Sequence, residues 1–215
     1  MTTDEIFRST RKEYNQGALD EGMVGPDPLT FFRRWYEEAL QSEALEPNAC
    51  ALATVGSDMR PSNRMVLLKG LDERGLTFYT NYLSRKGRQL SENPFAALLF
   101  FWASRERSVR IEGEIEKISS EESAAYFASR PRASQLGAVA STQSSVARSR
   151  SELEEQLKEM DAQYSDKPIP RPDQWGGYRL KPTMYEFWQG RENRMHDRIR
   201  YVVHGGTWSI ERLWP

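Results

Sequence analysis

Alternating apolar and polar positions over the middle and the C-terminal part of the chain predict a β-sheet. Between residues 49 and 118 the apolar runs are separated by turns of a few residues, such as Gly56-Ser57-Asp58. Connections this short join antiparallel neighbours, because a parallel crossover needs a dozen residues or more. The pattern therefore predicts an antiparallel meander or small barrel and not a doubly wound sheet. The expected strands are 49–55, 62–69, 76–81, 95–102, 107–118, 178–180, 185–189, 197–203 and 207–213.

Helical spacing of apolar residues marks the segments around these strands. One helix opens at Asp27-Pro28 and runs to about Leu45, and others are expected at 119–130 and 149–164, with a short one after Ser84. The fold class expected is therefore α+β, a β-barrel with peripheral helices. Residues 1–25 are polar, contain three glycines and show no apolar period, which indicates a mobile N-terminal arm before a single domain at 26–215.

Composition narrows the classes of function. The chain has 215 residues, a net charge of −1 and 38% hydrophobic residues, so it is globular and lacks the basic excess of a dedicated nucleic-acid binder. Its longest apolar run, Phe95–Trp102, is far shorter than a membrane span. One cysteine, Cys50, and two histidines argue against a disulfide or a metal site. Because the N-terminus also lacks the apolar core of a signal peptide, a cytoplasmic location is the simplest interpretation.

The sequence contains neither of the common nucleotide-binding loops and no GxSxG elbow. It does contain basic residues at positions where a positive charge is unfavourable. Ser84 has the position of a helix N-cap, and Arg85 and Lys86 follow it in the first turn. A helix N-terminus carries partial positive charge, so two cations there favour a bound anion such as phosphate. Two solvated surface cations are an equally good interpretation of these residues alone.

Two further groups of cations lie on expected strands. Arg64 and Lys69 flank an apolar stretch and, being five residues apart, should lie on opposite faces, although snorkelling at both ends also explains them. Arg194, His196 and Arg198 share one face if their segment is extended, where their mutual repulsion favours an anionic ligand. A solvated edge strand is the alternative for this second group.

A fourth cluster closes a predicted helix. Pro131 stops the helix and leaves Tyr126 and Arg130 on one face, with Ser134 just beyond. Hydroxyl groups beside a guanidinium can hold a phosphate, but helix capping explains the pattern as well. Four such clusters in a nearly neutral chain suggest more than one bound phosphate.

The motifs around these residues, in this order, resemble the pyridoxine (pyridoxamine) 5′-phosphate oxidase family over nearly the whole chain from about residue 11. The matching stretches are RMVLLKG (64–70), FYTN (78–81) with SRKG (84–87), YFASRPRASQLGA (126–138), STQSS (141–145), WGGYRL (175–180) and FWQGRENRMHDRI (187–199).

The resemblance implies an FMN-binding split barrel that works as a homodimer, with each active site built from both subunits. It implies oxidation of pyridoxamine or pyridoxine 5′-phosphate to pyridoxal 5′-phosphate, the synthesis and salvage step of vitamin B6 metabolism. A hydride passes from C4′ of the substrate to flavin N5, and O2 takes up the electrons as hydrogen peroxide. The protein supplies stacking, orientation and charge. The composition, as given above, argues against a metal and against a nucleic-acid or membrane partner.

The resemblance also implies roles for individual residues, by position. Arg194 and His196 would be catalytic. The substrate would be bound by Lys69, Tyr126, Arg130, Ser134, Arg194, Met195 and His196. The FMN contacts would be Arg64, Met65, Val66, Leu67, Tyr79, Thr80, Arg85, Lys86, Gln143, Ser144, Trp188 and Arg198. Arg11 and Tyr14 resemble a family segment that folds over the substrate, which would make the arm a lid.

This sequence departs from the family pattern at a few positions. Ser108 stands where the family usually has a glutamine on the flavin, and Trp214 stands where it has alanine. Ala128 and Thr142 replace other usual residues that are not ligand contacts. Two rival functions are another flavin or deazaflavin split-barrel enzyme, which need not keep these phosphate-binding residues, and a pyridoxal 5′-phosphate carrier, which has no need of FMN.

Overall fold

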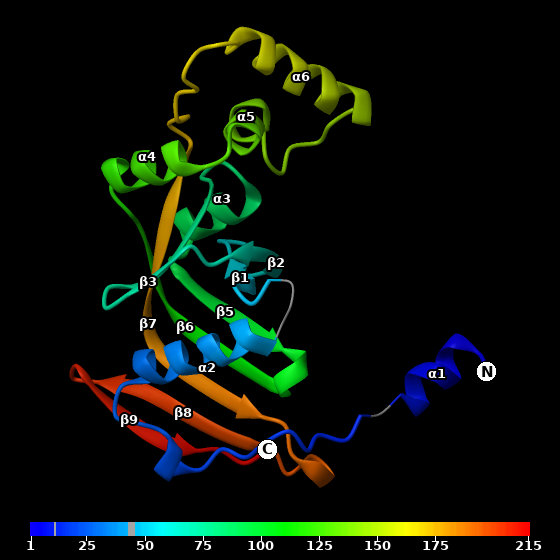
Figure 1. The fold of residues 1–215 in the computed structure, drawn as a ribbon, viewed down its shortest axis with the longest axis vertical. Coiled ribbons are helices and arrows are strands. Elements are labelled where there is room, and N and C mark those ends of the chain that lie inside the picture. The colour runs from blue at the N-terminus through cyan, green and yellow to red at the C-terminus, as the bar shows by residue number, and fades with distance from the viewer. Residues whose placement is uncertain (11, 43–45) are drawn as a thin grey trace. The chain divides into compact units, whose positions relative to one another are not determined.

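The computed structural model describes residues 1–10, 12–42 and 46–215 (Figure 1), and within them the chain forms an antiparallel sheet with helices around it. The helices are α1 (Thr3–Ser9), α2 (Pro28–Ser42), α3 (Arg85–Glu92), α4 (Ser120–Ser129), α5 (Arg132–Ala140) and α6 (Arg150–Gln163). The strands are β1 (Ala49–Val55), β2 (Pro61–Leu67), β3 (Gly70–Asp72), β4 (Gly75–Asn81), β5 (Phe95–Trp102), β6 (Arg107–Lys117), β7 (Trp175–Gln189), β8 (Asp197–His204) and β9 (Thr207–Arg212). The α+β fold class expected from the sequence is confirmed.

The chain divides into two compact units, and the strands β5, β6 and β7 contribute residues to both. The first unit holds Met1–Pro47, Leu99–Ile111 and Thr183–Pro215. Its core forms where the apolar face of α2 meets β5 and β7: the Phe32 ring lies 5.1 Å from Phe100, and the Phe31 ring 4.5 Å from Phe187. Helix α2 begins where the sequence predicts, because Asp27 accepts hydrogen bonds from the backbone N–H groups of Leu29 and Thr30.

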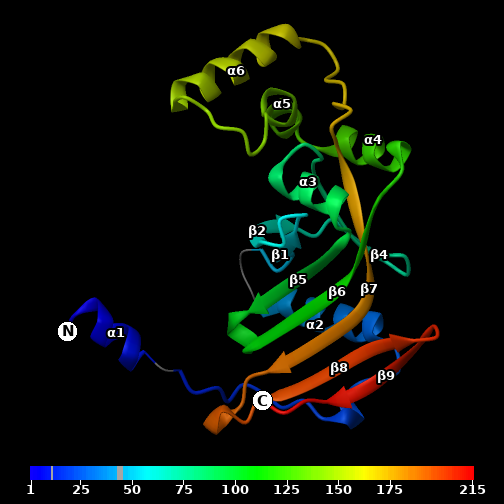
Figure 2. The ribbon, with the colours of Figure 1, turned by 180° about the vertical axis from the view of Figure 1, so that it is seen from behind.

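The second unit holds Asn48–Leu98 and Glu112–Pro182. Its strands follow the order β2-β1-β5-β6-β7-β4-β3, and Figure 2 shows β4 beside β7 from behind. In the β1–β2 hairpin Leu52 pairs with Arg64, and in the β4–β7 pair Tyr79 faces Gly177. A smaller apolar cluster of Phe127, Leu136, Ile169 and Trp175 joins α4 and α5 to the start of β7. This cluster holds α4 and α5 against the sheet.

Most elements expected from the sequence are present, with four corrections. Residues 178–180 and 185–189 belong to one continuous strand, β7. Strand β2 ends at Leu67, two residues earlier than expected, and the short strand β3 and the helix α5 were not expected at all. Helix α5 begins immediately after Pro131, because proline ends α4 but also suits the start of the next helix. The expected C-terminal end of α2, residues 43–45, lies outside the described residues.

The N-terminal segment contains local structure that its composition did not indicate. Helix α1 has a capping box in which Thr2 accepts a hydrogen bond from the Glu5 N–H. Further along, Leu19 is only 1% exposed, and its N–H donates to Asp197 at 3.0 Å. The division into a mobile arm at 1–25 and a single domain at 26–215 stays a prediction.

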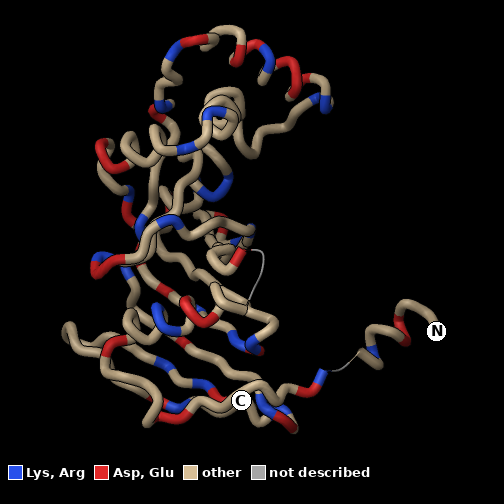
Figure 3. The backbone as a smooth tube through the Cα atoms, in the orientation of Figure 1, with Lys and Arg blue, Asp and Glu red and all other residues tan. Residues whose placement is uncertain are grey.

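Charge is distributed in small groups of opposite sign along the helices and strands (Figure 3). At the start of α6, Arg148 pairs with Glu152 and Arg150 with Glu154, the i,i+4 arrangement of a solvated helix. Among the described residues, no helix has both the length and the apolar character needed to cross a membrane.

Glycine at position 87 is required by packing, which yields a first prediction. A Cβ at Gly87 in α3 would lie 2.0 Å from the Tyr82 carbonyl oxygen, whereas one at Gly137 in α5 would meet nothing within 4 Å. We expect Gly87→Ala to lower the free energy of unfolding by about 1–3 kcal/mol through overpacking. Gly137→Ala, the matched helical control, should raise it by about 0.5–1 kcal/mol. Denaturant titration of both variants measures this, and equal shifts would contradict the packing analysis.

Candidate functional site

The second unit contains a cavity of about 500 Å³ that is lined by several basic side chains. Four basic side chains line it, those of Arg64, Lys69, Lys86 and Arg130, and no Asp or Glu is among its described lining residues. The other lining residues are Met65, Val66, Leu67, Tyr79, Thr80, Tyr126, Pro131, Ser134, Gln143 and Trp175. Cations that repel one another in a shared cavity favour an anionic occupant.

Lys86 is the most buried of these cations, at 8% exposure. It lies in the first turn of α3, whose N-cap is Ser84, as the sequence predicts. Its ammonium group donates to three neutral oxygens: Thr80 Oγ1 at 3.0 Å, Ser84 Oγ at 3.2 Å and Gln143 Oε1 at 2.8 Å. Burial, with a smaller contribution from Arg64, lowers the pKa of Lys86 to about 8.

Arg64 enters the cavity from β2 and is held by uncharged groups. Its guanidinium donates to the Leu52 carbonyl at 3.1 Å, to Thr54 Oγ1 at 2.5 Å and to Ser62 Oγ at 2.6 Å. Burial and then the repulsion from Arg85 lower the pKa of Arg64. The arginine is therefore fixed in orientation while its positive charge stays uncompensated.

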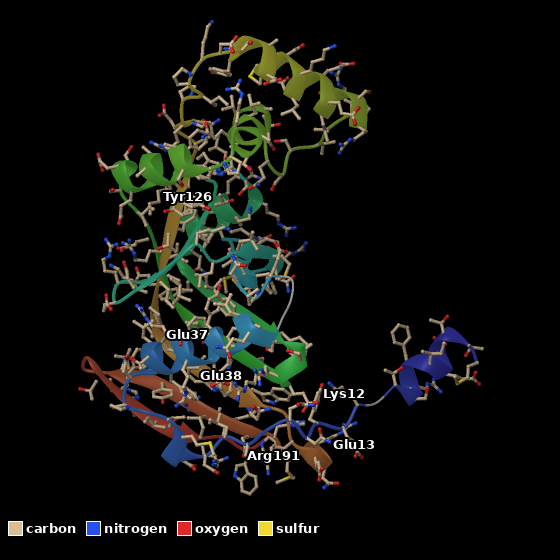
Figure 4. All side chains as sticks on the ribbon, in the orientation of Figure 1. Lys12, Glu13, Glu37, Glu38, Tyr126 and Arg191 are labelled. Atoms are coloured by element: carbon tan, nitrogen blue, oxygen red, sulfur yellow. The ribbon has the colours of Figure 1, made fainter. Side chains whose placement is uncertain are left out.

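A stack of aromatic rings forms another wall. The Tyr79 ring on β4 stacks on Tyr126 of α4, at 3.8 Å between ring centroids, and the nearly parallel Trp175 ring at the start of β7 lies 5.5 Å from Tyr79 and 6.3 Å from Tyr126. Figure 4 shows Tyr126 on α4. The Arg130 guanidinium lies over the Trp175 ring at 4.7 Å, and its Nη1 is buried without a hydrogen-bond partner among the described residues. Burial lowers the pKa of Arg130. An anion in the cavity would give the unpartnered Nη1 an acceptor for its hydrogen bond.

The expectation that Arg64 and Lys69 lie on opposite faces of one strand is wrong. Because β2 ends at Leu67, the alternation of strand faces does not extend to Lys69, whose N–H instead donates to the Thr77 carbonyl at 2.8 Å. Both residues line the same cavity and do not serve two separate faces.

A second cavity, of about 460 Å³, lies in the first unit and contains Arg194 and His196. Its other lining residues are Thr10, Lys12, Glu13, Tyr14, Arg191 and Asn193, of which Figure 4 labels Lys12, Glu13 and Arg191. The Arg191 N–H donates to His196 Nδ1 at 3.1 Å, and the imidazole packs on Trp188 at 4.8 Å between centroids.

The backbone at this second cavity is strained. Asn193 and Arg194 have φ of 54° and 61°, in the left-handed region that non-glycine residues rarely adopt. The expectation that Arg194, His196 and Arg198 share one strand face is therefore wrong, because residues 192–194 form a 3₁₀ turn and β8 begins at Asp197.

Several expected site residues lie outside the first cavity. In the second unit, Arg85 and Ser144 are exposed and do not line it. Trp188, Arg198 and Ser108 belong to the first unit. There Arg198 pairs with Glu186 at 2.8 Å and donates to the Trp214 carbonyl at 2.8 Å. Met195 lines a neighbouring cavity with Tyr14 and Arg191, and Arg11 lies outside the described residues.

Two contributions to the first cavity were not expected from the sequence, that of Trp175 in its lining and that of Ser84 as a partner of Lys86. Trp175 completes the aromatic wall; it begins the family motif WGGYRL, but nothing in the sequence indicated that its ring lines a cavity. Ser84 was recognised as a cap, but its hydrogen bond to the Lys86 ammonium was not anticipated. Both contributions depend on side-chain geometry that no local pattern encodes.

The antiparallel sheet with its peripheral helices places the chain among the α+β split-barrel proteins. Residues 36–164 match the family described as pyridoxamine 5′-phosphate oxidase, and residues 175–215 match the pyridoxine 5′-phosphate oxidase C-terminal dimerisation region. The chain belongs to this family, as its motifs predict. Membership supports oxidoreductase activity, flavin binding and assembly as a dimer.

Individual relatives agree with this assignment. A pyridoxine/pyridoxamine 5′-phosphate oxidase of Burkholderia lata is 56% identical over 218 residues, covering 100% of each chain. Another, of Acaryochloris marina, is 54% identical over 213 residues, 99% of this chain and 97% of the relative. The crystal structure of PhzG from Burkholderia lata, in complex with tetrahydrophenazine-1-carboxylic acid, has a TM-score of 0.84 at 34% identity over 89% of this chain and 94% of that one.

The pKa of Lys86 leads to a second prediction. Only the ammonium form attracts a phosphate, and in the ligand-free protein it loses its proton near pH 8. The affinity for FMN should therefore fall as the pH rises through about 8, by up to tenfold per pH unit. Lys86→Met should bind FMN more weakly and lose this dependence, whereas the exposed-lysine control Lys158→Met should keep both. Flavin fluorescence titrations across this pH range measure the affinities, and a flat wild-type profile would contradict the prediction.

Proposed function

We propose that this protein is an FMN-dependent oxidase that converts pyridoxamine and pyridoxine 5′-phosphate to pyridoxal 5′-phosphate, with O2 as electron acceptor. The observation that carries the proposal is the first cavity, with four basic side chains and no carboxylate among its described lining residues. One phosphate would leave part of this charge uncompensated, whereas the phosphates of a flavin and of a substrate together match it. Membership of the oxidase family supports the same conclusion.

The residues present fit the phosphate of FMN. Lys86 is buried against neutral oxygens only, and Arg64 is fixed beside it with its charge uncompensated. Together with Arg85 and the N-terminus of α3, these groups would hold the phosphate, and Met65 to Leu67 would border the isoalloxazine ring. FMN held there would supply the redox chemistry, as acceptor of a hydride from the substrate C4′ and donor of electrons to O2.

A second group of cavity residues suits the phosphate of the substrate. Arg130 presents a buried Nη1 that has no partner among the described residues, and Tyr126, Ser134 and Lys69 line the same cavity. The Arg130 guanidinium packs on the Trp175 ring at 4.7 Å and on the Phe127 ring at 5.7 Å, and these contacts help to hold it in place. This part of the chain would bind and orient the substrate through its phosphate.

Arg194 and His196 are proposed to act at the ring and the reacting carbon. The hydrogen bond from the Arg191 N–H to His196 Nδ1 leaves Nε2 to carry the proton of the neutral imidazole, so that it can donate toward a ligand. We propose that each active site of the homodimer is built from both subunits, and the match of residues 175–215 to the dimerisation region supports the dimer.

The visible spectrum tests the proposed function directly. The purified protein should show a flavin band that bleaches on anaerobic addition of pyridoxine 5′-phosphate and returns in air. A yellow protein that does not bleach would indicate another substrate for the flavin, such as a compound like the tetrahydrophenazine-1-carboxylic acid in the PhzG complex. A protein that takes up no FMN would support the carrier instead.

A third prediction separates the reacting residues from the flavin site. Arg194→Ala should lower kcat/KM by about 100-fold or more, because the substrate ring loses an orienting contact. It should retain FMN, since Arg194 lines the cavity of the first unit. Arg150→Ala, on the solvated face of α6, is the control that should keep full activity. Stopped-flow reduction and flavin content measure the two effects, and loss of flavin from Arg194→Ala would refute the assignment.

A further inference from the structure

Glu106 is a buried carboxylate for which the proposed reaction has no use. It is 1% exposed, and it follows the 3₁₀ turn Ala103–Arg105 with φ 53° and ψ 42°. This is the left-handed region, where glycine or asparagine is the usual residue. A glutamate in such a position indicates that its side chain has a task that offsets the backbone strain.

The partners of this carboxylate, among the described residues, all lie in residues 12–16, called here the arm segment. Oε2 accepts hydrogen bonds from the backbone N–H groups of Asn15 at 2.8 Å and Gln16 at 3.0 Å. Oε1 lies 3.1 Å from the Lys12 ammonium. Although burial opposes ionisation, these hydrogen bonds hold the pKa of Glu106 below its usual range. The neighbouring Arg107 pairs with Glu38 instead.

The same residue also positions the backbone that Tyr14 packs on. The Glu106 carbonyl accepts a hydrogen bond from the Gly190 N–H at 2.8 Å. The Tyr14 ring fills the space above Gly190, where a Cβ would lie 2.7 Å from Tyr14 Cγ. From there the ring meets Trp188 at 5.5 Å and His196 at 5.7 Å, both edge-to-face. Tyr14 thus forms a wall of the cavity that contains Arg194 and His196.

We propose that Glu106 is a positioning residue that anchors the arm segment and thereby sets Tyr14 against His196, closing the cavity over a planar substrate ring. The two hydrogen bonds from backbone N–H groups to the charged carboxylate, together with the Lys12 ion pair, favour the anchored state. The anchoring rests on contacts within the first unit alone, while its consequence for turnover rests on the proposed function.

Hydrogen exchange on the full-length protein tests the anchoring without any activity. In Glu106→Gln, the amides of Asn15 and Gln16 should exchange at least about tenfold faster than in the wild type, because a charged acceptor is replaced by a neutral one. Glu106→Asn, which suits the left-handed backbone but is one methylene shorter, should show the same loss. Glu92→Gln is the matched control, because Glu92 accepts the Ser57 N–H at 2.8 Å in the other unit. Unchanged exchange in both Glu106 variants would overturn the proposal.

Kinetics test whether Glu106 acts through Tyr14. Glu106→Gln should raise KM for pyridoxine 5′-phosphate about tenfold or more at unchanged flavin content, and Tyr14→Ala should do the same. The double variant should be no worse than Tyr14→Ala alone, since the two residues serve one contact. Additive effects would overturn the role of Glu106 as a positioning residue. A wild-type protein that does not oxidise this substrate would refute the proposed function but leave the exchange result intact.

Discussion

A buried ammonium group surrounded by neutral oxygens is the interaction on which the candidate site depends. Lys86 reaches Thr80, Ser84 and Gln143, and none of these can neutralise its charge. Burying a cation in this way is costly unless an anion joins it. The end of β4, the cap of α3 and the segment around residue 143 are brought together at this one group, so the local fold is organised around an anion.

The rest of the cavity follows the same rule of fixed but uncompensated charge. Arg64 is oriented by a carbonyl and two hydroxyl groups, and Arg130 by the face of Trp175. Neutral partners hold a side chain in place without reducing its attraction for phosphate. A carboxylate in their place would fix the geometry equally well, but it would compete with the ligand. The cavity is thus preorganised for anions at the expense of stability in the ligand-free state.

The first unit uses the opposite arrangement, in which a buried anion is fully satisfied. Glu106 takes two backbone N–H groups and an ammonium from a segment about 90 residues earlier in the chain. Nearby, Asn193 and Arg194 adopt left-handed backbone conformations that hold Arg194 at the cavity. Strain of this kind persists only where surrounding contacts determine the backbone, and the hydrogen bond from Arg191 to His196 is one of them.

The sequence by itself determined most of the elements and the residue types of the site. Strand and helix periods, the Ser84 cap and the stop at Pro131 are local, and each depends on hydrogen bonds or packing within a few residues. The cationic clusters and the family motifs were equally visible. Only the tertiary structure decided that Arg64 and Lys69 share one cavity, because that depends on where β2 ends. The tertiary structure alone also placed the Arg130 guanidinium over the Trp175 ring and the arm segment against Glu106. Such contacts between distant residues are set by packing and leave no periodic signal in the chain.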